Sequence, residues 1–554
     1  MSDTGGAVLV PASGAPAEAP ATVPAGTIVD GGGRRCGRRA GGWAGLAAFV
    51  CYLAVALWLS AHDLVFPDAM SRVANGYYVL FSRDPHLAAI GFVWNPLPSL
   101  ATIPLLLATP LWPALASRAL AGCLVSALCG ACSVALMHRL LGRLGAGPAM
   151  RLVLTAVFAL HPLVLLGSAT GASEAMLLLV CLYVTVHLVE WLEQDDIWQL
   201  VHVGVGAGVA YLVRYEALAL GAAAALLVLL VSWWRSRRRR GAAGLALTDM
   251  VLVAAPVAAS FGLWALASKV IVGSWLETFT SQYGNSAQVG TFRESIEGIV
   301  GTGTHAHLAY IGTQLANTAP LAVPLVLVAL VVALRRREAT PLAPVFVLGS
   351  VLAFQNLTFL RGMSFGWLRF QIAAVPLGVA AAGYLAGVLT GWGRPPAPRR
   401  VLAVILGVAM VATLPPAWRA ERNPSLAREE ALAVQVADGG QYPMERRVAA
   451  DIAAMGLGRG AVITDVAYSF PVVLSAEDPR VYVITADGDF ERLLADPLPN
   501  GVSYALLTSP DAAPADAVAE RYPGMWEDGA GRAEMVRQWS DGRGLTWRLY
   551  RFTG

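Results

Sequence analysis

The sequence predicts a polytopic α-helical membrane protein of about eleven transmembrane helices, with a C-terminal extracytoplasmic α/β domain. Three observations lead to this fold class. Hydrophobic residues make up 56% of the chain and charged residues 14%, against roughly 25% charged residues in soluble domains. Apolar runs of nearly 20 residues, long enough to cross a bilayer, recur along the chain. The composition then changes after about residue 416.

Residues 1–40 are predicted to be a disordered cytoplasmic tail. Residues 1–33 are rich in Ala, Pro and Gly and show no apolar periodicity, which is typical of disordered segments. An arginine cluster precedes the first apolar run, and no small-residue cleavage site follows it. The run is therefore interpreted as an uncleaved first helix and not as a signal peptide.

A transmembrane domain is predicted over residues 41–416. Each span needs about 20 mainly apolar residues. The apolar runs predict spans near 43–60, 117–137, 152–168, 174–192, 197–213, 216–234, 248–268, 315–334, 341–360, 370–392 and 401–416.

The run 96–113 is apolar as well, but we expect it to lie along the outer interface, because it contains five prolines that disfavour a straight helix. With this run outside the count and the N-terminus inside, the basic loops fall in the cytoplasm, as the positive-inside rule requires. The odd number of spans then places the C-terminus outside. The main outer loops are 61–116 and 269–314. The cytoplasmic arginines are Arg139, Arg143, Arg235, Arg237–Arg240, Arg335–Arg337, Arg394, Arg399 and Arg400.

Residues 417–554 are predicted to form the α/β domain. A helix is expected in ERRVAADIAAMGLG, and strands in GAVITDVAY, PRVYVITAD, GVSYALLTSP and GLTWRLYRFTG. Alternating helix and strand signals are typical of an α/β fold. No Gly-rich phosphate loop opens a helix, so a support or acceptor-binding role is favoured over catalysis.

Charged residues in or beside membrane spans are costly and tend to mark function. Asp68 lies just past the outer end of the first span. Arg72 follows four residues later, so a surface Asp–Arg pair on a helix is an equally good interpretation. Asp63 competes for the same role.

Further charged residues lie at predicted outer helix ends. Glu174 begins the fourth span, where a carboxylate also stabilises a helix N-terminus. Arg214 and Glu216 can simply pair with each other. Arg361 and Arg369 stand at the outer face of a chain whose other basic residues lie mostly inside. An anionic ligand such as a lipid phosphate would explain them, and snorkelling interfacial arginines are the alternative.

Two histidines and two residues of the second outer loop are weaker candidates. His305 and His307 have a spacing that suits a metal ion in an extended segment, although no third ligand is evident. Tyr283 and Asn285 can contact a substrate or be ordinary loop residues. The sequence thus indicates no definite cofactor, and a divalent metal ion stays possible.

The order of these features resembles the GT-C superfamily of membrane glycosyltransferases, in the branch of the protein O-mannosyltransferases and aminoarabinose transferases. The resemblance covers roughly residues 40–420. It is carried by FPDAMSRVANGYYV, WNPLPSLATIPLL, HPLVLLGSATGASEAMLLLVCLYV, GVGAGVAYLVRYEALAL and WLRFQIAAVPLG.

The resemblance implies a polyprenyl-phosphate sugar donor and transfer on the outer leaflet. Asp68 matches the first-loop acid, which serves as base or orients the acceptor, and Glu174 falls where some members carry a second acid. Many members have Asp-Glu at the first motif, whereas Asp68 is followed by Ala69. The donor phosphate would be held by Arg369, Arg361 and Arg214. The candidate substrate contacts are Arg72, Tyr77, Asn95, Glu216, Tyr283 and Asn285.

The predicted function is therefore an inverting glycosyl transfer from a lipid-linked sugar to an envelope glycan, lipid or protein, by a multi-pass protein of the cell membrane. Two other classes stay open. A degenerate GT-C-like scaffold or lipid-carrier subunit would share most of these features. A secondary transporter usually shows internal repeats, which this sequence does not, and has little use for a large outer domain.

Overall fold

The computed structural model describes residues 31–391, 396–429, 442–540 and 546–553. Most of the predicted tail lies outside these ranges. Helix α1 begins at Gly31 and ends at Ala61. The sequence predicted a disordered tail over residues 1–40, whereas residues 31–40 are helical in this structure. The reason is that extending an existing helix gains a hydrogen bond for each residue added.

Each of the eleven predicted spans contains an apolar helix. Eight helical segments in the described chain are long and apolar enough to cross a membrane, or up to ten if each of two bent pairs is one span. The number of crossings therefore stays a prediction. The long segments are the Arg39–Ala61 part of α1, α6 (Leu120–Arg143), α9 (Glu174–Gln194), α11 (Ala217–Ser236), α12 (Ala242–Ile271), α18 (Leu342–Leu360), η2 (Leu368–Gln371) with α19 (Ala374–Thr390), and α20 (Ala397–Val411) with α21 (Leu414–Ala420). The shorter helix α10 covers Ile197–Val213.

Two predicted spans are bent instead of straight. Helices α7 (Pro148–Leu160) and α8 (Pro162–Ala169) meet at 57°, and α16 (Gly303–Thr318) and α17 (Ala322–Arg336) meet at 83°. A proline stands at each break, Pro162 and Pro320. The residue before a proline disfavours the helical conformation, and His161 is accordingly extended.

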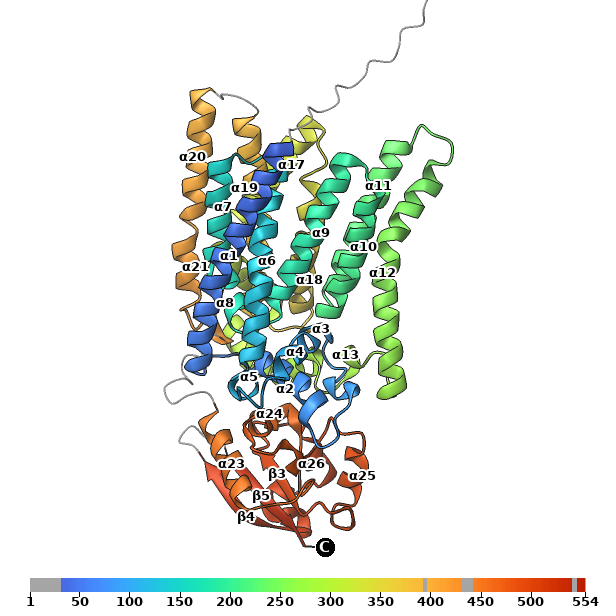
Figure 1. Cartoon of the computed structure of the whole chain (residues 1–554), viewed down its shortest axis with the longest axis vertical. Helices are drawn as coiled ribbons and strands as arrows, with labels where there is room; N and C mark the ends of the chain where they lie inside the picture. Colours follow the sequence, from blue (N-terminus) through green and yellow to red (C-terminus); the bar gives the residue numbers. More distant parts are fainter. Residues whose placement is uncertain (1–30, 392–395, 430–441, 541–545, 554) are drawn as a thin grey trace, which may run out of the picture.

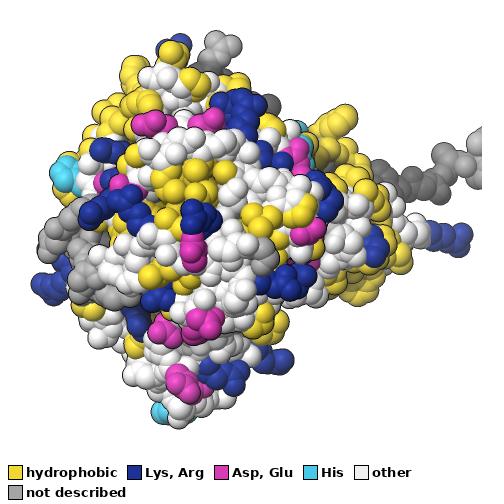
Figure 2. Space-filling view, turned by 90° about the horizontal axis from the view of Figure 1, so that it is seen from below, with side chains coloured by type: hydrophobic (Ala, Val, Ile, Leu, Met, Phe, Trp, Pro, Cys, Tyr) yellow, Lys and Arg dark blue, Asp and Glu magenta, His cyan; other side chains and the backbone are white. Residues whose placement is uncertain are grey.

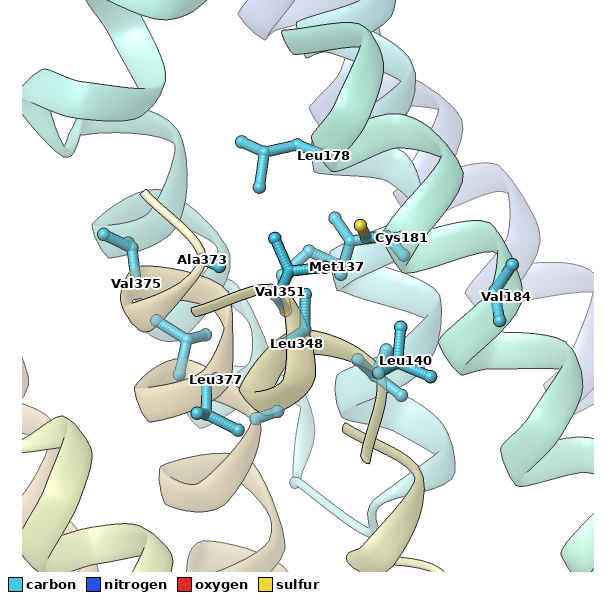
Figure 3. Packing of buried hydrophobic residues seen from close by; sticks show 14 of the residues in the cluster. Met137, Leu140, Leu178, Cys181, Val184, Leu348, Val351, Ala373, Val375 and Leu377 are labelled. Carbon is cyan, nitrogen blue, oxygen red and sulfur yellow. The ribbon is translucent and has the colours of Figure 1, made fainter. Parts of the chain in front are cut away.

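The packing of the bundle is built from small and branched residues. A large buried cluster joins α6, α9, α18 and α19, and Figure 3 shows Met137, Cys181, Leu348 and Val351 at its centre. Apolar side chains such as Leu226, Val251 and Val404 stay exposed on the outside of the bundle. A helical membrane protein has an apolar interior and also exposes an apolar outer surface to lipid, so its helices are apolar on all sides.

Residues 61–116, the predicted first outer loop, fold into short helices at one end of the bundle, beside the C-terminal region (Figure 1). They comprise α2 (Pro67–Phe81), η1 (Leu87–Ile90), α3 (Leu97–Leu100), α4 (Ile103–Leu106) and α5 (Ala114–Ser117). The proline-rich run is thus broken into single turns. A Cβ at Gly76 would lie 2.6 Å from Thr102 Oγ1, so the glycine lets α2 pack closely on this run.

The second outer loop is helical too. It contains α13 (Glu277–Thr280), α14 (Asn285–Thr291), α15 (Arg293–Val300) and the start of α16.

Residues 442–553 contain a five-stranded sheet of order β2-β1-β3-β5-β4. Strand β1 is parallel to β2 and β3, and β5 is antiparallel to β3 and β4. The elements are α23 (Pro443–Ala454), β1 (Val462–Thr464), α24 (Val466–Ser475), η4 (Pro479–Val481), β2 (Tyr482–Ile484), α25 (Phe490–Ala495), η5 (Leu498–Asn500), β3 (Tyr504–Thr508), α26 (Ala517–Arg521), α27 (Met525–Asp528), η6 (Gly529–Gly531), β4 (Ala533–Ser540) and β5 (Thr546–Phe552).

The C-terminal region docks on the first outer loop. Buried residues of α2, α5, α23 and α24 form one hydrophobic cluster. Arg446 donates to both carboxylate oxygens of Asp63, at 2.7 and 2.6 Å, and Arg83 pairs with Asp487 and Asp489. Asp63, the competitor of Asp68, therefore binds an arginine of the C-terminal region and helps to hold that region in place. The opposite end of this region, seen from below in Figure 2, carries side chains of both charges.

Candidate active site

Four chain segments meet where the bundle joins the first outer loop, and each brings a charged residue. Asp68 lies in the first turn of α2, directly after Pro67, whose fixed φ suits a helix start. Glu174 is the first residue of α9. Arg214 ends α10, and Arg369 lies in the 3₁₀ turn before α19. Helix ends place these side chains together, although they are up to 301 residues apart.

Arg369 is the centre of this arrangement. Its Nη2 donates to Asp68 Oδ2 at 2.5 Å and its Nη1 to Glu174 Oε1 at 3.2 Å. Its Nε lies 2.8 Å from Glu429 Oε2. The Arg369 side chain is 8% exposed and that of Asp68 is 46% exposed. One buried guanidinium thus joins three carboxylates, of which Asp68 is accessible from outside.

Arg214 forms a second, deeper ion-pair group. Its Nη1 donates to Glu174 Oε1 at 2.8 Å, and its Nη2 donates to Glu216 Oε1 at 2.6 Å. Gln355 also donates to Glu216. The expected Arg214–Glu216 pair is therefore present, and Glu174 connects it to Arg369. Buried charges need such pairing, since an unpaired charge away from water is costly.

Arg72 completes the group. It is buried, its guanidinium lies 5.6 Å from the centre of the Trp94 ring, and its Nη1 has no hydrogen-bond partner among the described residues. It lines a narrow crevice with Ala69, Gly122 and Gly171. Arg72 does not form the predicted ion pair with Asp68, because the Asp68 carboxylate pairs with Arg369 instead.

The electrostatic environment keeps Asp68 ionised. Burial would raise the pKa of Asp68, but the charge and hydrogen bond of Arg369, together with the charges of Arg72 and Arg214, hold that pKa below its usual value. Asp68 is therefore a carboxylate at neutral pH, the form that can accept a proton.

The other predicted contacts lie around this group and not in it. Arg361 is exposed at the C-terminal end of α18. Tyr77 is buried on α2, near Asp478 and Arg480 of the C-terminal region.

The remaining three predicted contacts bind protein groups. Asn95 donates to the backbone oxygen of Tyr211 at 2.7 Å. Tyr283 donates to Asp465 Oδ2 at 2.8 Å, and Asn285 donates to the Tyr215 hydroxyl at 2.8 Å. These bonds tie the outer loops to the bundle and to the C-terminal region.

The predicted histidine metal site is wrong in its local structure. His305 and His307 lie on helix α16 and not in an extended segment, and residues two apart on a helix do not face each other. His307 packs against the Phe359 ring, 5.0 Å away. In the described ranges no group of three or more His, Cys, Asp or Glu side chains could hold a metal ion.

Glu429 is the site residue that sequence reasoning missed. It follows the last apolar helical segment, Ala397–Ala420, and reaches back to Arg369. An acidic residue shortly after the end of a span was the available signal.

Comparisons with known proteins bear on this arrangement. The family model described as dolichyl-phosphate-mannose-protein mannosyltransferase matches residues 113–259, a segment that contains Glu174, Arg214 and Glu216. The solved structure of ArnT from Cupriavidus metallidurans in the apo state is 16% identical, with a TM-score of 0.50, over 90% of this chain and 97% of that chain.

Two further solved structures are similar. ArnT from Cupriavidus metallidurans bound to undecaprenyl phosphate is 15% identical with a TM-score of 0.49, over 90% of this chain and 97% of that chain. The oligosaccharyltransferase AglB from Archaeoglobus fulgidus, in complex with an inhibitory peptide and a dolichol-phosphate, is 11% identical with a TM-score of 0.43, over 84% of this chain and 69% of that chain. No protein of curated function matches the sequence.

The predicted resemblance to the GT-C superfamily is confirmed by the family match and by the fold of apo ArnT. The predicted glycosyltransferase class agrees with the family model, whose description names a mannosyltransferase, and the long apolar helices agree with a polytopic membrane protein.

Proposed function

We propose that this protein transfers a sugar from a polyprenyl-phosphate-linked donor to a cell-envelope acceptor on the outer side of the cell membrane, with inversion at the anomeric carbon. The observation that carries the proposal is the Asp68–Arg369 pair, in which a half-exposed carboxylate lies 2.5 Å from a buried arginine. Such a transfer requires a base beside a phosphate-binding cation, and the close approach of Asp68 and Arg369 supports these two roles.

The reaction needs one bond to form and one to break at the anomeric carbon. The acceptor hydroxyl attacks this carbon while the bond from the carbon to the phosphate oxygen breaks. Asp68 accepts the hydroxyl proton as the new glycosidic bond forms. The polyprenyl phosphate leaves with the bonding electron pair, and Arg369 stabilises the charge that builds on it.

The remaining charged residues position these two. Glu174 and Arg214 fix the Arg369 guanidinium from the buried side, so it is oriented before the donor arrives. Preorganised charges are more effective than mobile ones because no reorganisation is needed during the reaction. The C-terminal region, which packs on α2 through α24, supports the helix that carries Asp68.

The test is transfer of radiolabelled sugar from a panel of polyprenyl-phosphate sugars to an envelope extract, by the purified wild type and by Asp68→Asn. Loss of a general base typically costs about 10²- to 10⁴-fold in rate. We therefore expect transfer by the wild type and a loss of that size in the variant, which keeps the shape of the side chain.

Two results would contradict the proposal. Full transfer by a folded Asp68→Asn protein would remove Asp68 as the base. The absence of transfer from every donor would favour the non-catalytic scaffold, for which the self-paired arginines of this site would be sufficient.

A further inference from the structure

Each nitrogen of Arg369 lies within ion-pair distance of a carboxylate, Nη1 of Glu174, Nη2 of Asp68 and Nε of Glu429, but among the described residues the Nε–H makes no hydrogen bond. A phosphate that binds Arg369 must therefore replace at least one carboxylate. Which one leaves decides where the donor sits. The inference below rests on the proposed function.

Glu174 is held too firmly to leave. Its side chain is 2% exposed, and Arg214 binds the same oxygen as Arg369, at 2.8 Å. Displacing it would leave a buried carboxylate and break a second ion pair, which typically costs several kcal/mol.

Asp68 is accessible, but it has to stay for a different reason. As the proposed base it must lie beside the reacting carbon, which in the donor is bonded to the phosphate. Moving Asp68 away from Arg369 would separate the base from the phosphate. The two groups need neighbouring positions on the same guanidinium.

Glu429 offers that neighbouring position. The Nε–H and Nη2–H bonds of a guanidinium are nearly parallel and can bind one anion or two adjacent oxygens. In this protein Nη2 donates to Asp68, whereas Nε lies 2.8 Å from Glu429 Oε2 without a hydrogen bond to it, so the Nε–H is left for another acceptor. A phosphate in the place of the Glu429 carboxylate would lie directly beside Asp68.

The charge balance also favours this exchange. The site contains four carboxylates, Asp68, Glu174, Glu216 and Glu429, and three guanidinium groups, Arg72, Arg214 and Arg369. Adding an anionic phosphate to this set would increase its negative charge. A sugar phosphodiester carries one negative charge, so replacing Glu429 leaves the charge around Arg369 unchanged.

We propose that the Nε edge of Arg369 is the subsite for the donor phosphate, and that Glu429 occupies this subsite until the donor displaces it. Glu429 lies outside the helix ends that build the rest of the site, in the segment after α21. It is thus an internal competitor for the lipid phosphate.

The test measures the affinity of the purified full chain in detergent for a polyprenyl phosphate without sugar, so that no transfer is needed. The proteins are the wild type, Glu429→Gln, Glu429→Ala and Arg369→Gln, with Glu477→Gln as control. Glu477 is an exposed glutamate of the C-terminal region, so this control removes one negative charge away from the site.

Removing the charge of Glu429 should raise the affinity for polyprenyl phosphate about tenfold, because the phosphate then has no competing carboxylate to displace; tenfold corresponds to about 1.4 kcal/mol. Glu429→Ala should show the same gain, Glu477→Gln should bind as the wild type does, and Arg369→Gln should lose binding. Thermal unfolding of each variant checks that it is folded.

Unchanged or weaker binding by both Glu429 variants, with binding still lost in Arg369→Gln, would overturn this inference and leave the proposed function intact. Binding by none of the proteins would overturn both. A gain seen with inorganic phosphate but not with polyprenyl phosphate would assign the subsite to free phosphate and contradict its role for the donor.

Discussion

Acidic residues at the end of the helix bundle are paired with arginines, whereas the buried acids Asp465 and Asp516 of the C-terminal region are held mainly by backbone N–H groups. Asp465 accepts from the N–H groups of Ala467 and Ala517, and Asp516 from those of Val518 and Ala519. Both surroundings satisfy a carboxylate, but they act on its charge differently.

The pKa values of these acids show the difference. Burial raises the pKa of Asp516 to about 7, reinforced by the charge of Asp465, and burial also raises the pKa of Asp465. Around Asp68 the arginines outweigh burial, and its pKa is lowered. A nearby full positive charge keeps a carboxylate ionised, whereas N–H groups alone do not prevent it from taking up a proton.

The largest effect is expected from removing Arg369, the arginine that pairs with the acidic residues at the end of the helix bundle. Arg369→Gln removes the ion pairs that Asp68, Glu174 and Glu429 form with this arginine, so we expect about 3 kcal/mol of destabilisation. Sugar transfer should fall by about 10²- to 10³-fold, as for other lost charge-stabilising groups. Thermal unfolding and radiolabelled transfer measure the two effects.

Arg238→Gln is the matched control for that change, because Arg238 is exposed just past the end of α11, at the opposite end of that helix from Glu216. It should leave both measurements within error of the wild type. Equal losses in the two variants would show that the effect of Arg369 does not come from its ion pairs.

A smaller effect is expected in the C-terminal region. The folded-state pKa of Asp516 lies above the value of about 3.9 expected in the unfolded chain. The folded state therefore binds more protons between these two values, and the stability of the C-terminal region should rise as pH falls from 8 to 5. Asp516→Asn removes the titrating group while an asparagine still caps α26. The variant should gain stability at pH 8, on the order of a few kcal/mol by linkage, and lose this pH dependence.

Limited proteolysis across this pH range, with cleavage read within residues 442–553, measures this effect. An Asp516→Asn protein that keeps the pH dependence of the wild type would show that another group is responsible. Asp487, whose pKa burial raises to about 6, would then be the next residue to change.

The smallest effect is expected in the pH dependence of transfer itself. Because the pKa of Asp68 is lowered, its base form should persist through mildly acidic pH. The rate constant for transfer should therefore change little on the acid side between pH 7 and pH 5. A loss of rate centred near pH 6 would mean that Asp68 is not the base, or that its arginine neighbours move away when the donor binds.

The sequence predicted the helices well because each apolar run is a local property. It did not predict the bends at Pro162 and Pro320, since a proline marks a break without giving its angle. Residues 31–40 were assigned to a disordered tail from composition, although they belong to helix α1.

The residues of the site were predicted in part because a charge at the end of an apolar run is also a local property of the sequence. Asp68, Glu174, Arg214 and Arg369 were recognisable as charges at helix ends, and the structure brings them together. Their pairing was not predictable, because a contact between residues 301 positions apart depends on the whole bundle. Tyr283 and Asn285 lie where loop residues are expected, but their partners belong to other parts of the fold.

The bidentate contact between Asp63 and Arg446 spans 383 positions of the chain. At a synthesis rate of about 5–20 residues per second, Arg446 is made roughly 20–80 s after Asp63. Throughout that interval the first outer loop, including α2 with Asp68, lacks the surface on which it finally packs. Completion of this end of the molecule is therefore one of the last events in the biogenesis of the protein, long after its first helices have been made.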